Sequence, residues 1–151
     1  EFGPGTGSMT RELLHRLPAE AKLLVFETNP RFCRYLEEQF RDSRLVVLNE
    51  PAEYAAWRLQ KFGYARVDGV ISTLGLTLMQ EETRHQLFRN LAPFMGDGTV
   101  LTQVQYLHRW GIGPLLRKHF REVSHRSVWG NVPPAGFFVC RRSANLPVLQ
   151  D

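Results

Sequence analysis

The chain has 151 residues, a formal net charge of +4 and a hydrophobic share of 43%. This length suits one domain with a sizeable core, and a charged share of 23% excludes a disordered or fibrous protein. No apolar run approaches the roughly 18 residues that a membrane-spanning helix needs. The two cysteines, Cys33 and Cys140, are far apart and are expected to be buried or half-buried free thiols of a reducing cytoplasm.

Apolar residues predict an alternation of helices and short strands from the start of the chain. A helix is expected over residues 8–17, where Ser8 or Thr10 can cap its first N–H groups. The apolar run over 21–27 predicts a buried strand, and a second helix is expected to begin at Pro30. One stripe of this second helix carries its larger apolar side chains, Phe32, Tyr35, Leu36 and Phe40.

The rest of the chain continues the alternation. Strands are expected over 44–49, 68–74 and 99–106 and near 121–128 and 136–142, and helices over 52–63 and 81–95 and near 113–120. Gly63 and the Gly96-Asp97-Gly98 turn are expected to close the helices that precede them. This order predicts an α/β, doubly wound, mostly parallel sheet covered on both faces. The last two strands, joined through Pro133 and Pro134, predict an antiparallel hairpin at one edge.

Three glycines at alternate positions, Gly3, Gly5 and Gly7, precede the first expected helix. Glycine is needed where backbone takes a positive φ or approaches a ligand closely, as in the loop after the first strand of a doubly wound sheet. Glu27 ends the next strand about 20 residues on, where an acid accepts hydrogen bonds from ribose hydroxyls. Loop and acid together predict a site for a dinucleotide or for S-adenosylmethionine (SAM).

The spacing of the glycines favours SAM. The dinucleotide fingerprint is G-x-G-x-x-G/A, whereas here the third glycine comes one residue early and Ser8 stands where Gly or Ala is required. Glu1 completes the pattern E-x-G-x-G-x-G. This pattern resembles the first motif of the class I SAM-dependent methyltransferases.

The resemblance extends over essentially the whole chain and narrows to one family. Five segments in order are similar to bacterial phospholipid N-methyltransferases: residues 1–18, 26–40, 68–76, 82–106 and 129–142. Those enzymes methylate phosphatidylethanolamine stepwise toward phosphatidylcholine at the cytoplasmic membrane surface. The resemblance implies a Rossmann-like methyltransferase sheet, SAM as cofactor and no metal. It implies an amine acceptor, foremost a phospholipid head group, and a cytoplasmic protein with peripheral contact to the anionic inner membrane face.

The same resemblance implies roles for individual residues around the cofactor. The three glycines would bring backbone against the methionine part of SAM, and Glu27 would hold the ribose hydroxyls. The remaining cofactor-binding residues would be Glu1 in the first motif, Thr28 and Asn29 at the edge of the adenine, Asn49 and Glu50 at the end of the strand over 44–49, and Ser72.

The residues expected to be catalytic, on the acceptor side of the site, are Ser72, Thr73 and Tyr106. Methyl transfer is an in-line displacement, to which a protein contributes chiefly proximity and alignment. The resemblance implies that Ser72 and Thr73, near the end of the strand over 68–74, lie close to the sulfonium and the nucleophile. Methylated amines are attracted to aromatic faces by roughly 0.5–2 kcal/mol. Tyr106, together with Trp110 and Trp129, is therefore expected to line the acceptor side, with Tyr106 the most important of the three.

One departure from the family pattern leaves the acceptor open. The phospholipid enzymes tend to carry S-x-L-P-L here, and Gly75 in place of proline is expected to loosen the loop that faces the methyl group. The alternatives are an rRNA adenine methyltransferase, a small-molecule amine methyltransferase and a SAM-binding module without chemistry. Base methylation is disfavoured because residues 72–75 lack an aromatic that could stack on a flipped base. Residues 131–134 resemble such a motif but fall between the last two strands.

The glycine loop has no strand in front of it in this sequence. That strand would be the central one of the sheet, and its loss would leave two rows of N–H and C=O groups unpaired inside the protein. We therefore expect the sequence to be part of a longer polypeptide, whose upstream residues supply a strand and a helix. In phospholipid methyltransferases the corresponding upstream part is amphipathic and contacts the membrane.

Overall fold

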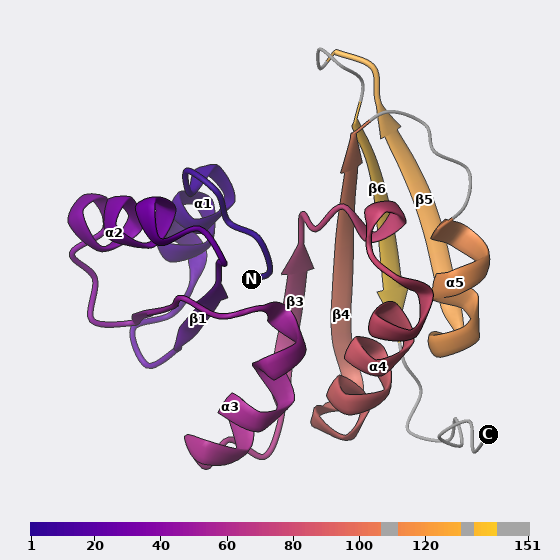
Figure 1. Cartoon of the computed structure of the whole chain (residues 1–151), viewed down its shortest axis with the longest axis horizontal. Helices are drawn as coiled ribbons and strands as arrows, with labels where there is room; N and C mark the ends of the chain where they lie inside the picture. The colour runs from indigo at the N-terminus through magenta and orange to yellow at the C-terminus, as the bar shows by residue number, and fades with distance from the viewer. Residues whose placement is uncertain (107–111, 131–134, 142–151) are drawn as a thin grey trace. The chain divides into compact units, whose positions relative to one another are not determined.

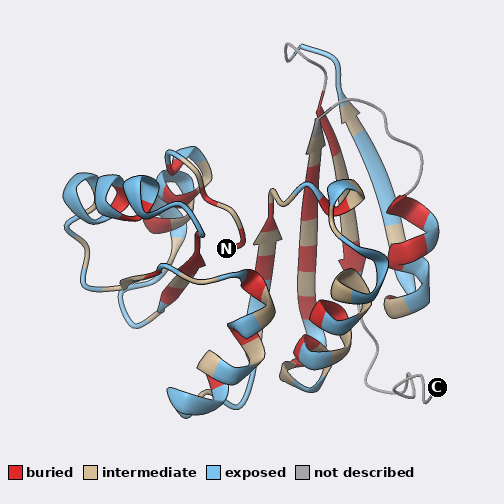
Figure 2. Ribbon diagram, viewed as in Figure 1, coloured by how far each residue is buried: buried red, intermediate tan, exposed pale blue. Residues whose placement is uncertain are grey.

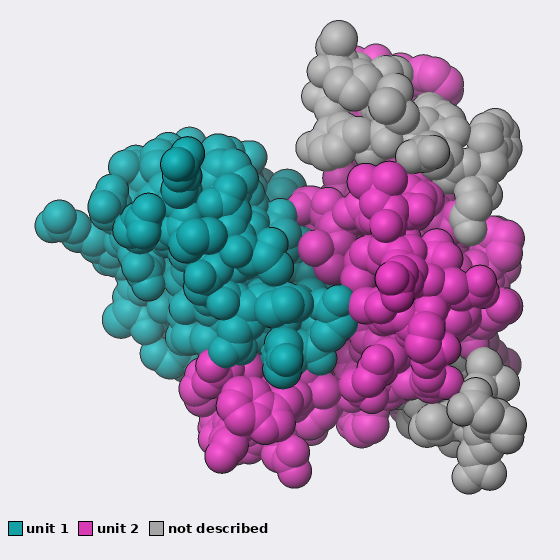
Figure 3. Space-filling view, in the orientation of Figure 1, with its two compact units in different colours: residues 1–54 teal, residues 55–151 magenta. Residues whose placement is uncertain are grey.

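The computed structural model describes residues 1–106, 112–130 and 135–141 (Figure 1). The chain divides into two compact units, residues 1–54 and residues 55–151, which Figure 3 shows in separate colours. Each unit carries its own sheet, of two strands in the first and four in the second. Strands and helices alternate in both units, as the sequence predicts for an α/β protein.

Unit 1, residues 1–54, is built on a short parallel sheet. Its elements are α1 (Ser8–Arg16), β1 (Leu23–Phe26), α2 (Pro30–Gln39), β2 (Leu45–Leu48) and the 3-10 helix η1 (Ala52–Tyr54). β1 and β2 pair in parallel along their whole length. On β1, Phe26 also forms a parallel bridge with Phe2. The residues in front of the glycines therefore run beside β1 in strand-like pairing.

The core of unit 1 joins both helices to the sheet through aliphatic side chains. Its buried members are Leu14 of α1, Leu23 and Val25 of β1, and Leu36 of α2. On α2 the buried residues are Cys33 and Leu36, and Phe40 packs against the core from the end of the helix. This is the spacing i, i+3, i+7 of one helix face.

The expected stripe on α2 is therefore only partly right. Leu36 and Phe40 belong to the packed face, but Phe32 and Tyr35 are 36% and 40% exposed. Each precedes a buried residue by one position, which turns its side chain about 100° away from the core on a helix of 3.6 residues per turn.

Gly7 lies where α1 meets α2. Its φ is +80°, and an added Cβ would stand 2.6 Å from both Leu36 Cδ2 and Phe40 Cε2. A side chain at this position would therefore have to displace Leu36 and Phe40. Gly7 is also the N-cap of α1, which has no side-chain cap, so the expected capping by Ser8 or Thr10 is wrong.

Unit 2 is a four-stranded mixed sheet in the order β3-β4-β6-β5. Its strands are β3 (Val67–Ser72), β4 (Met95–Tyr106), β5 (Glu122–Val128) and β6 (Ala135–Arg141). Its helices are α3 (Ala55–Lys61), α4 (Glu81–Leu91) and α5 (Ile112–His119), with 3-10 helices η2 (Leu76–Leu78) and η3 (Ala92–Phe94). β3 and β4 are parallel, whereas β6 is antiparallel to both β4 and β5. The predicted antiparallel edge hairpin is confirmed; the residues of its Pro133-Pro134 turn lie outside the described ranges.

The start of β4 differs from the prediction. The Gly96-Asp97-Gly98 segment, expected to be a turn, belongs to the strand. The register with β3 shifts there, because Val67 pairs with Met95 but Gly69 pairs with Val100. The extra residues on β4 form an irregularity, which Gly98 accommodates with a φ of +88°.

In unit 2 the inner strands β4 and β6 are more buried than the edge strand β5 (Figure 2). Leu101 of β4 and its pairing partner Cys140 of β6 are both fully buried. β5 is mostly exposed and carries charged side chains such as Glu122 and Arg126. Charges on an outer strand oppose pairing with other chains. Both cysteines are buried free thiols, as the sequence predicts.

The end of α5 packs on α4 through aromatic and imidazole rings. The Nδ1 of His85 and the Nε2 of His119 are 2.8 Å apart. The ring of Phe88 lies 5.2 Å from that of His119 and 5.7 Å from that of Phe120, centroid to centroid. Burial, with a smaller effect of neighbouring positive charges led by His85, lowers the pKa of His119 to about 4. His119 is therefore neutral in the folded protein near neutral pH.

Replacing Gly7 by alanine is expected to lower the free energy of unfolding by about 2–4 kcal/mol, because a positive φ disfavours Cβ and the methyl group overpacks Leu36 and Phe40. Gly5→Ala is the matched control. Its φ of +56° is similar, but nothing lies within 4 Å of the added Cβ, so a loss of only about 1–2 kcal/mol is expected. Urea denaturation measures both, and equal losses would contradict the packing role of Gly7.

Stability is expected to fall as the pH drops from about 6.5 to about 4. The unfolded chain protonates His119 near its ordinary pKa of 6.5, whereas the folded protein keeps it neutral down to about pH 4. The unfolded state therefore binds more protons in this window, which lowers the free energy of unfolding. His119→Phe should flatten this part of the curve, and His15→Gln, at an exposed histidine of α1, should not. An unchanged pH slope in His119→Phe would refute the assignment.

Candidate functional site

The glycine turn, defined here as residues 3–7, opens at the carboxyl end of β1. Phe26 N donates to the Glu1 carbonyl, and Gly3 N donates to the Phe26 carbonyl, both at 2.9 Å. Beyond that pairing the chain leaves β1, with φ values of +68° at Gly3 and +56° at Gly5. These are left-handed conformations that residues with a Cβ rarely adopt. The turn then leads directly into α1.

Glu27 follows β1 and is brought against this turn. Its Oε2 accepts a hydrogen bond from Gly5 N at 3.1 Å, and its Oε1 accepts one from Asn29 N at 2.8 Å. The side chain is largely buried, at 9% exposure. The loop and the acid that the sequence singled out are thus in direct contact, although they are 22 residues apart.

Two of the polar residues around Glu27 form hydrogen bonds that stabilise the fold, a role that the sequence did not indicate. Asn49 Nδ2 donates to the Glu27 carbonyl at 2.8 Å, which ties the end of β2 to the end of β1. Asn29 caps α2, because its Oδ1 accepts from Arg31 N at 2.9 Å. Thr28 is exposed and Glu50 is half-buried. All four lie at the same end of the small sheet as Glu27.

Glu1 is buried beneath the glycine turn at 8% exposure. Its Oε2 accepts a hydrogen bond from Thr10 Oγ1 at 2.6 Å, while Oε1 has no hydrogen-bond partner among the described residues. Burial raises the pKa of the Glu1 carboxyl. Thr10 is fully buried and was missed as a site residue. Its spacing of four residues from buried Leu14 is the signal that places it on the inner face of α1.

Unit 2 holds the residues predicted for the acceptor side. Ser72, at the end of β3, is 2% exposed, and its Oγ accepts a 3.4 Å hydrogen bond from Leu74 N. Thr73 is half-buried. Tyr106 is the last residue of β4 and pairs with Ala135; its side chain and Trp110 lie outside the described part of the structure. Trp129 is 72% exposed.

The loop after β3 is hydrogen-bonded at Gly75. This residue has φ −72° and ψ +66°, and Leu76 N donates to the Leu74 carbonyl at 2.8 Å across it. This is an inverse γ-turn, and its φ is one that proline also adopts. The expectation that glycine loosens the loop finds no support in this backbone conformation.

Gln103 is a residue of this region that sequence reasoning missed. It lies on β4 opposite Ser72 and is fully buried. Its Nε2 donates to the Leu74 carbonyl at 2.9 Å and to the Val104 carbonyl at 2.8 Å, while its Oε1 has no partner among the described residues. The sequence signal for Gln103 was its position two residues after Leu101, which places both side chains on the same face of the strand. A polar residue on the face that carries a core leucine is a candidate for a buried hydrogen-bonding role.

The described residues contain neither a metal-binding cluster nor a membrane-spanning helix. Within the described residues, no cluster of three or more His, Cys, Asp or Glu side chains is arranged to hold a metal ion. Of the helices in those same residues, none has both the length and the hydrophobicity to cross a membrane.

Sequence comparison finds methyltransferases. No family model matches the chain. The ornithine lipid N-methyltransferase of Singulisphaera acidiphila is 28% identical over 142 residues, covering 93% of this chain and 73% of that protein. The ribosomal RNA small subunit methyltransferase H of Aromatoleum aromaticum is 33% identical over 91 residues. That match covers 59% of this chain but only 29% of the rRNA enzyme.

Comparison with solved structures shows the fold. The N-methyltransferase NodS from Bradyrhizobium japonicum matches with a TM-score of 0.70 at 14% identity, covering 94% of this chain and 83% of NodS. Human methyltransferase-like protein 13, solved in complex with SAH, matches with a TM-score of 0.69 at 14% identity over 99% of this chain and 73% of its own. Together with the E-x-G-x-G-x-G turn and Glu27, these findings show the fold of the class I SAM-dependent methyltransferases and support an enzyme similar to the lipid N-methyltransferases.

Proposed function

We propose that the chain transfers methyl groups from SAM to the amine of a membrane lipid head group, at the cytoplasmic face of the membrane. The observation that carries the proposal is the buried carboxylate of Glu27 held against Gly5 of the glycine turn. An acid at this place is the arrangement that binds the ribose of a nucleotide-like cofactor. The lipid acceptor is supported by the relative that matches 93% of the chain, an ornithine lipid N-methyltransferase.

The residues of the glycine turn fit SAM in three respects. The space around Gly5 is open where a Cβ would stand, so its backbone is accessible to a ligand. Each Glu27 oxygen accepts one N–H and keeps a lone pair for a ribose hydroxyl. The buried, unpartnered Oε1 of Glu1 offers an acceptor for the amino group of the methionine part. Gly3, Thr28, Asn49 and Glu50 complete the proposed cofactor set, while Gly7 and Asn29 support it through packing and capping.

SAM supplies a methyl group that its sulfonium already activates. When bound, SAM would supply this methyl group to an unprotonated amine nitrogen, with SAH as the leaving group and the amine proton released to solvent. The protein contributes chiefly alignment. Holding the two reactants in the correct orientation lowers the activation barrier by at most about 7–11 kcal/mol. Ser72, Thr73 and Tyr106 remain our proposals for the acceptor side, within a single methyltransferase domain over residues 1–151.

The second candidate is rRNA methylation. It is favoured by the ribosomal RNA methyltransferases that match half to two thirds of the chain at 32–34% identity. The chain spans less than a third of the length of each of those enzymes. The lipid enzyme matches over most of both proteins, which is why we place the lipid amine first.

Glu27→Gln is expected to weaken SAM binding at least about tenfold, a loss of about 1.4 kcal/mol. The amide removes the negative charge and turns one acceptor into a donor that faces the N–H of Gly5 or Asn29. Isothermal titration with SAM measures the affinity. Glu12→Gln is the control, since Glu12 is an exposed acid of α1 that pairs with exposed Arg16. Equal SAM affinity in Glu27→Gln and the wild type would refute the cofactor site.

The acceptor is tested with the same pair of variants and labelled SAM. Vesicles that contain phosphatidylethanolamine and vesicles that contain ornithine lipid form two arms, with small-subunit rRNA as a third. Label in either lipid, lost in Glu27→Gln and kept in Glu12→Gln, supports the proposal and distinguishes the two amines. Label in rRNA alone would replace it by the second candidate. SAM binding without transfer to any arm would indicate a SAM-binding module.

Gln103→Met is expected to raise the KM for the lipid amine several-fold while the affinity for SAM stays unchanged. The variant removes the bond to the Leu74 carbonyl in the loop after Ser72 and the bond to the Val104 carbonyl, but keeps side-chain volume. Thr99→Val is the matched control on the same two strands, because Thr99 Oγ1 donates to the Val67 carbonyl at 2.7 Å at their other end. Each loss should cost about 1–3 kcal/mol of stability. A KM that rises equally in both variants would show that Gln103 acts only through stability.

A further inference from the structure

Arg84, near the start of α4, reaches the loop that follows β3. Its Nη1 donates a hydrogen bond to the Leu76 carbonyl at 3.3 Å. Leu76 N in turn donates to the Leu74 carbonyl, and Leu74 N donates to Ser72 Oγ. A short run of hydrogen bonds therefore connects the guanidinium of Arg84 to Ser72, one of the residues proposed for the acceptor side.

The guanidinium of Arg84 is incompletely bonded. Its Nε is buried and has no hydrogen-bond partner among the described residues. The Leu76 carbonyl does not depend on it, because Met79 N donates to the same oxygen at 3.3 Å. A buried charged donor without a partner is costly, and native proteins rarely keep one without a specific reason. Arg84 therefore has hydrogen-bonding capacity that the fold does not use.

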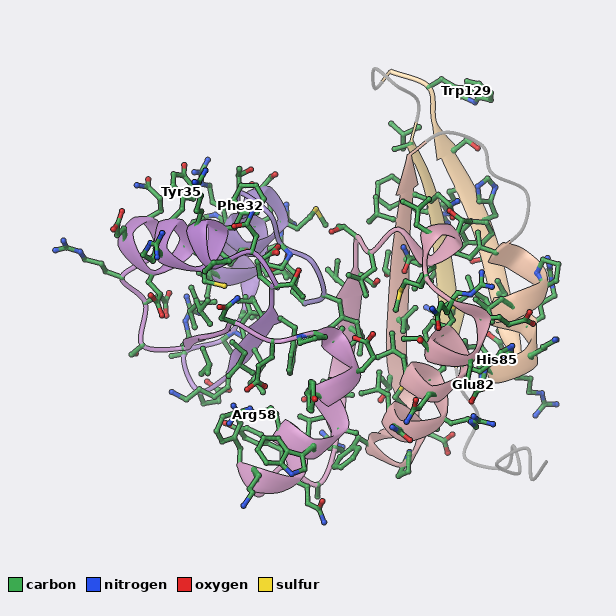
Figure 4. All side chains as sticks on the ribbon, viewed as in Figure 1. Phe32, Tyr35, Arg58, Glu82, His85 and Trp129 are labelled. Atoms are coloured by element: carbon green, nitrogen blue, oxygen red, sulfur yellow. The ribbon has the colours of Figure 1, made fainter. Side chains whose placement is uncertain are left out.

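The acids closest to Arg84 in the sequence are bound to other groups. Glu82 Oε1 accepts a hydrogen bond from Arg89 Nη2 at 2.6 Å, and Glu81 Oε1 lies 3.6 Å from His85 Nε2. Figure 4 labels Glu82 and His85 on α4. In the part of the chain that the structure describes, no acid forms an ion pair with Arg84. Its positive charge is therefore available to a ligand.

The N–H groups that remain on Arg84 form one edge of the guanidinium. Nη1 is used by Leu76, whereas the N–H groups of Nε and Nη2 point the same way along the adjacent edge. This edge matches two oxygens of a phosphate or a carboxylate, which arginine binds through paired, charge-assisted hydrogen bonds. The side chain as a whole is half-buried, so a small anion need not open the core to reach it.

We propose that Arg84 binds the anionic group of a zwitterionic acceptor, namely the phosphate or carboxylate that a lipid head group carries beside its amine. The inference rests on the proposed function, because the acceptor there is a lipid amine that reacts beside Ser72. A head group held by its anion at the loop after β3 loses the rotational freedom of a free amine. Such orientation of the reactant is the chief contribution that methyl transfer needs from the protein.

The charges around Arg84 favour a single small anion over the backbone of RNA. Residues 80–90 contain two acids and two arginines, so this part of α4 has no excess of positive charge. A nucleic acid backbone is bound chiefly by clustered cations that neutralise several phosphates together. One arginine among balanced charges suits one phosphate or one carboxylate, recognised by geometry.

Binding is tested without methyl transfer, in the presence of SAH, as the rise in melting temperature that each ligand causes. Glycerophosphoethanolamine carries a phosphate and an amine, Nα-acetylornithine carries a carboxylate and an amine, and ethanolamine carries an amine alone. Wild type is expected to respond to at least one of the two zwitterions and not to ethanolamine. The stronger of the two responses distinguishes a phosphate from a carboxylate. Inorganic phosphate is the fourth ligand and should bind more weakly than the preferred zwitterion.

Three variants assign the binding to Arg84. Arg84→Met removes the charge and all donors and should lower the affinity for the preferred zwitterion about tenfold or more, since hydrogen bonds to charged groups are the strong kind. Arg84→Lys keeps the charge without the paired donors and should recover only part of the affinity. Arg89→Met is the matched control, because it removes the same charge from the same helix at a residue that pairs with Glu82.

The melting temperature of the ligand-free protein separates binding from a structural role. Arg84→Met should leave it unchanged or raise it, because the variant removes a buried donor that has no partner and Met79 N still bonds the Leu76 carbonyl. SAM titration should give the wild-type affinity in all three variants. With labelled SAM, Arg84→Met should raise the KM for the zwitterionic lipid about tenfold and change kcat less.

Several outcomes would overturn the inference. Absence of any response of the wild type to both zwitterions would remove the site, and a response to inorganic phosphate as large as theirs would show an adventitious ion only. Equal losses of affinity in Arg84→Met and Arg89→Met would mean that only total charge matters. A lower ligand-free melting temperature of Arg84→Met with unchanged affinity would show that Arg84 only holds the loop. Binding of single-stranded RNA that is lost in Arg84→Met would assign the residue to nucleic acid.

Failure of the proposed function gives a different result. Zwitterion binding that depends on Arg84, without methyl transfer to any lipid or to rRNA, would support the anion site and refute the proposed function alone.

Discussion

The hydrogen bonds of the Glu27 carboxylate are the constraint on which unit 1 depends. A buried carboxylate is costly unless donors satisfy it, and here the donors are the backbone N–H groups of Gly5 and Asn29. One bond holds the glycine turn, and the other holds the start of α2. Asn49 secures the same point from β2 through the Glu27 carbonyl. The group proposed to bind the ribose is thus also the group that organises the loops around it.

The glycine turn is supported from beneath by contacts that make it rigid. Thr10 reaches back from α1 to Glu1, so the helix is tied to the residues that pair with β1. Gly7 allows α1 to pack directly on Leu36 and Phe40 of α2. A turn held in this way presents its backbone at Gly5 in one conformation, which lowers the entropic cost of binding a cofactor.

Unit 2 combines a buried polar side chain, Gln103, with an amphipathic helix, α3. Inside, Gln103 joins β4 to the loop that follows β3, in the strand pair whose register sets it opposite Ser72. Outside, α3 buries Ala55 and Leu59 and leaves Trp57 on the surface.

The sequence by itself determined the order of the elements and the antiparallel edge hairpin, and it singled out the glycine turn and Glu27 as candidate cofactor-binding features, because apolar periodicity and glycine spacing are local properties of the chain. Tertiary structure alone decided that Phe32 and Tyr35 point outward, that Thr10 bonds Glu1 rather than capping α1, and that Gln103 reaches Leu74. These contacts join residues distant in sequence, and their meeting depends on how helices and strands pack, which local patterns do not encode.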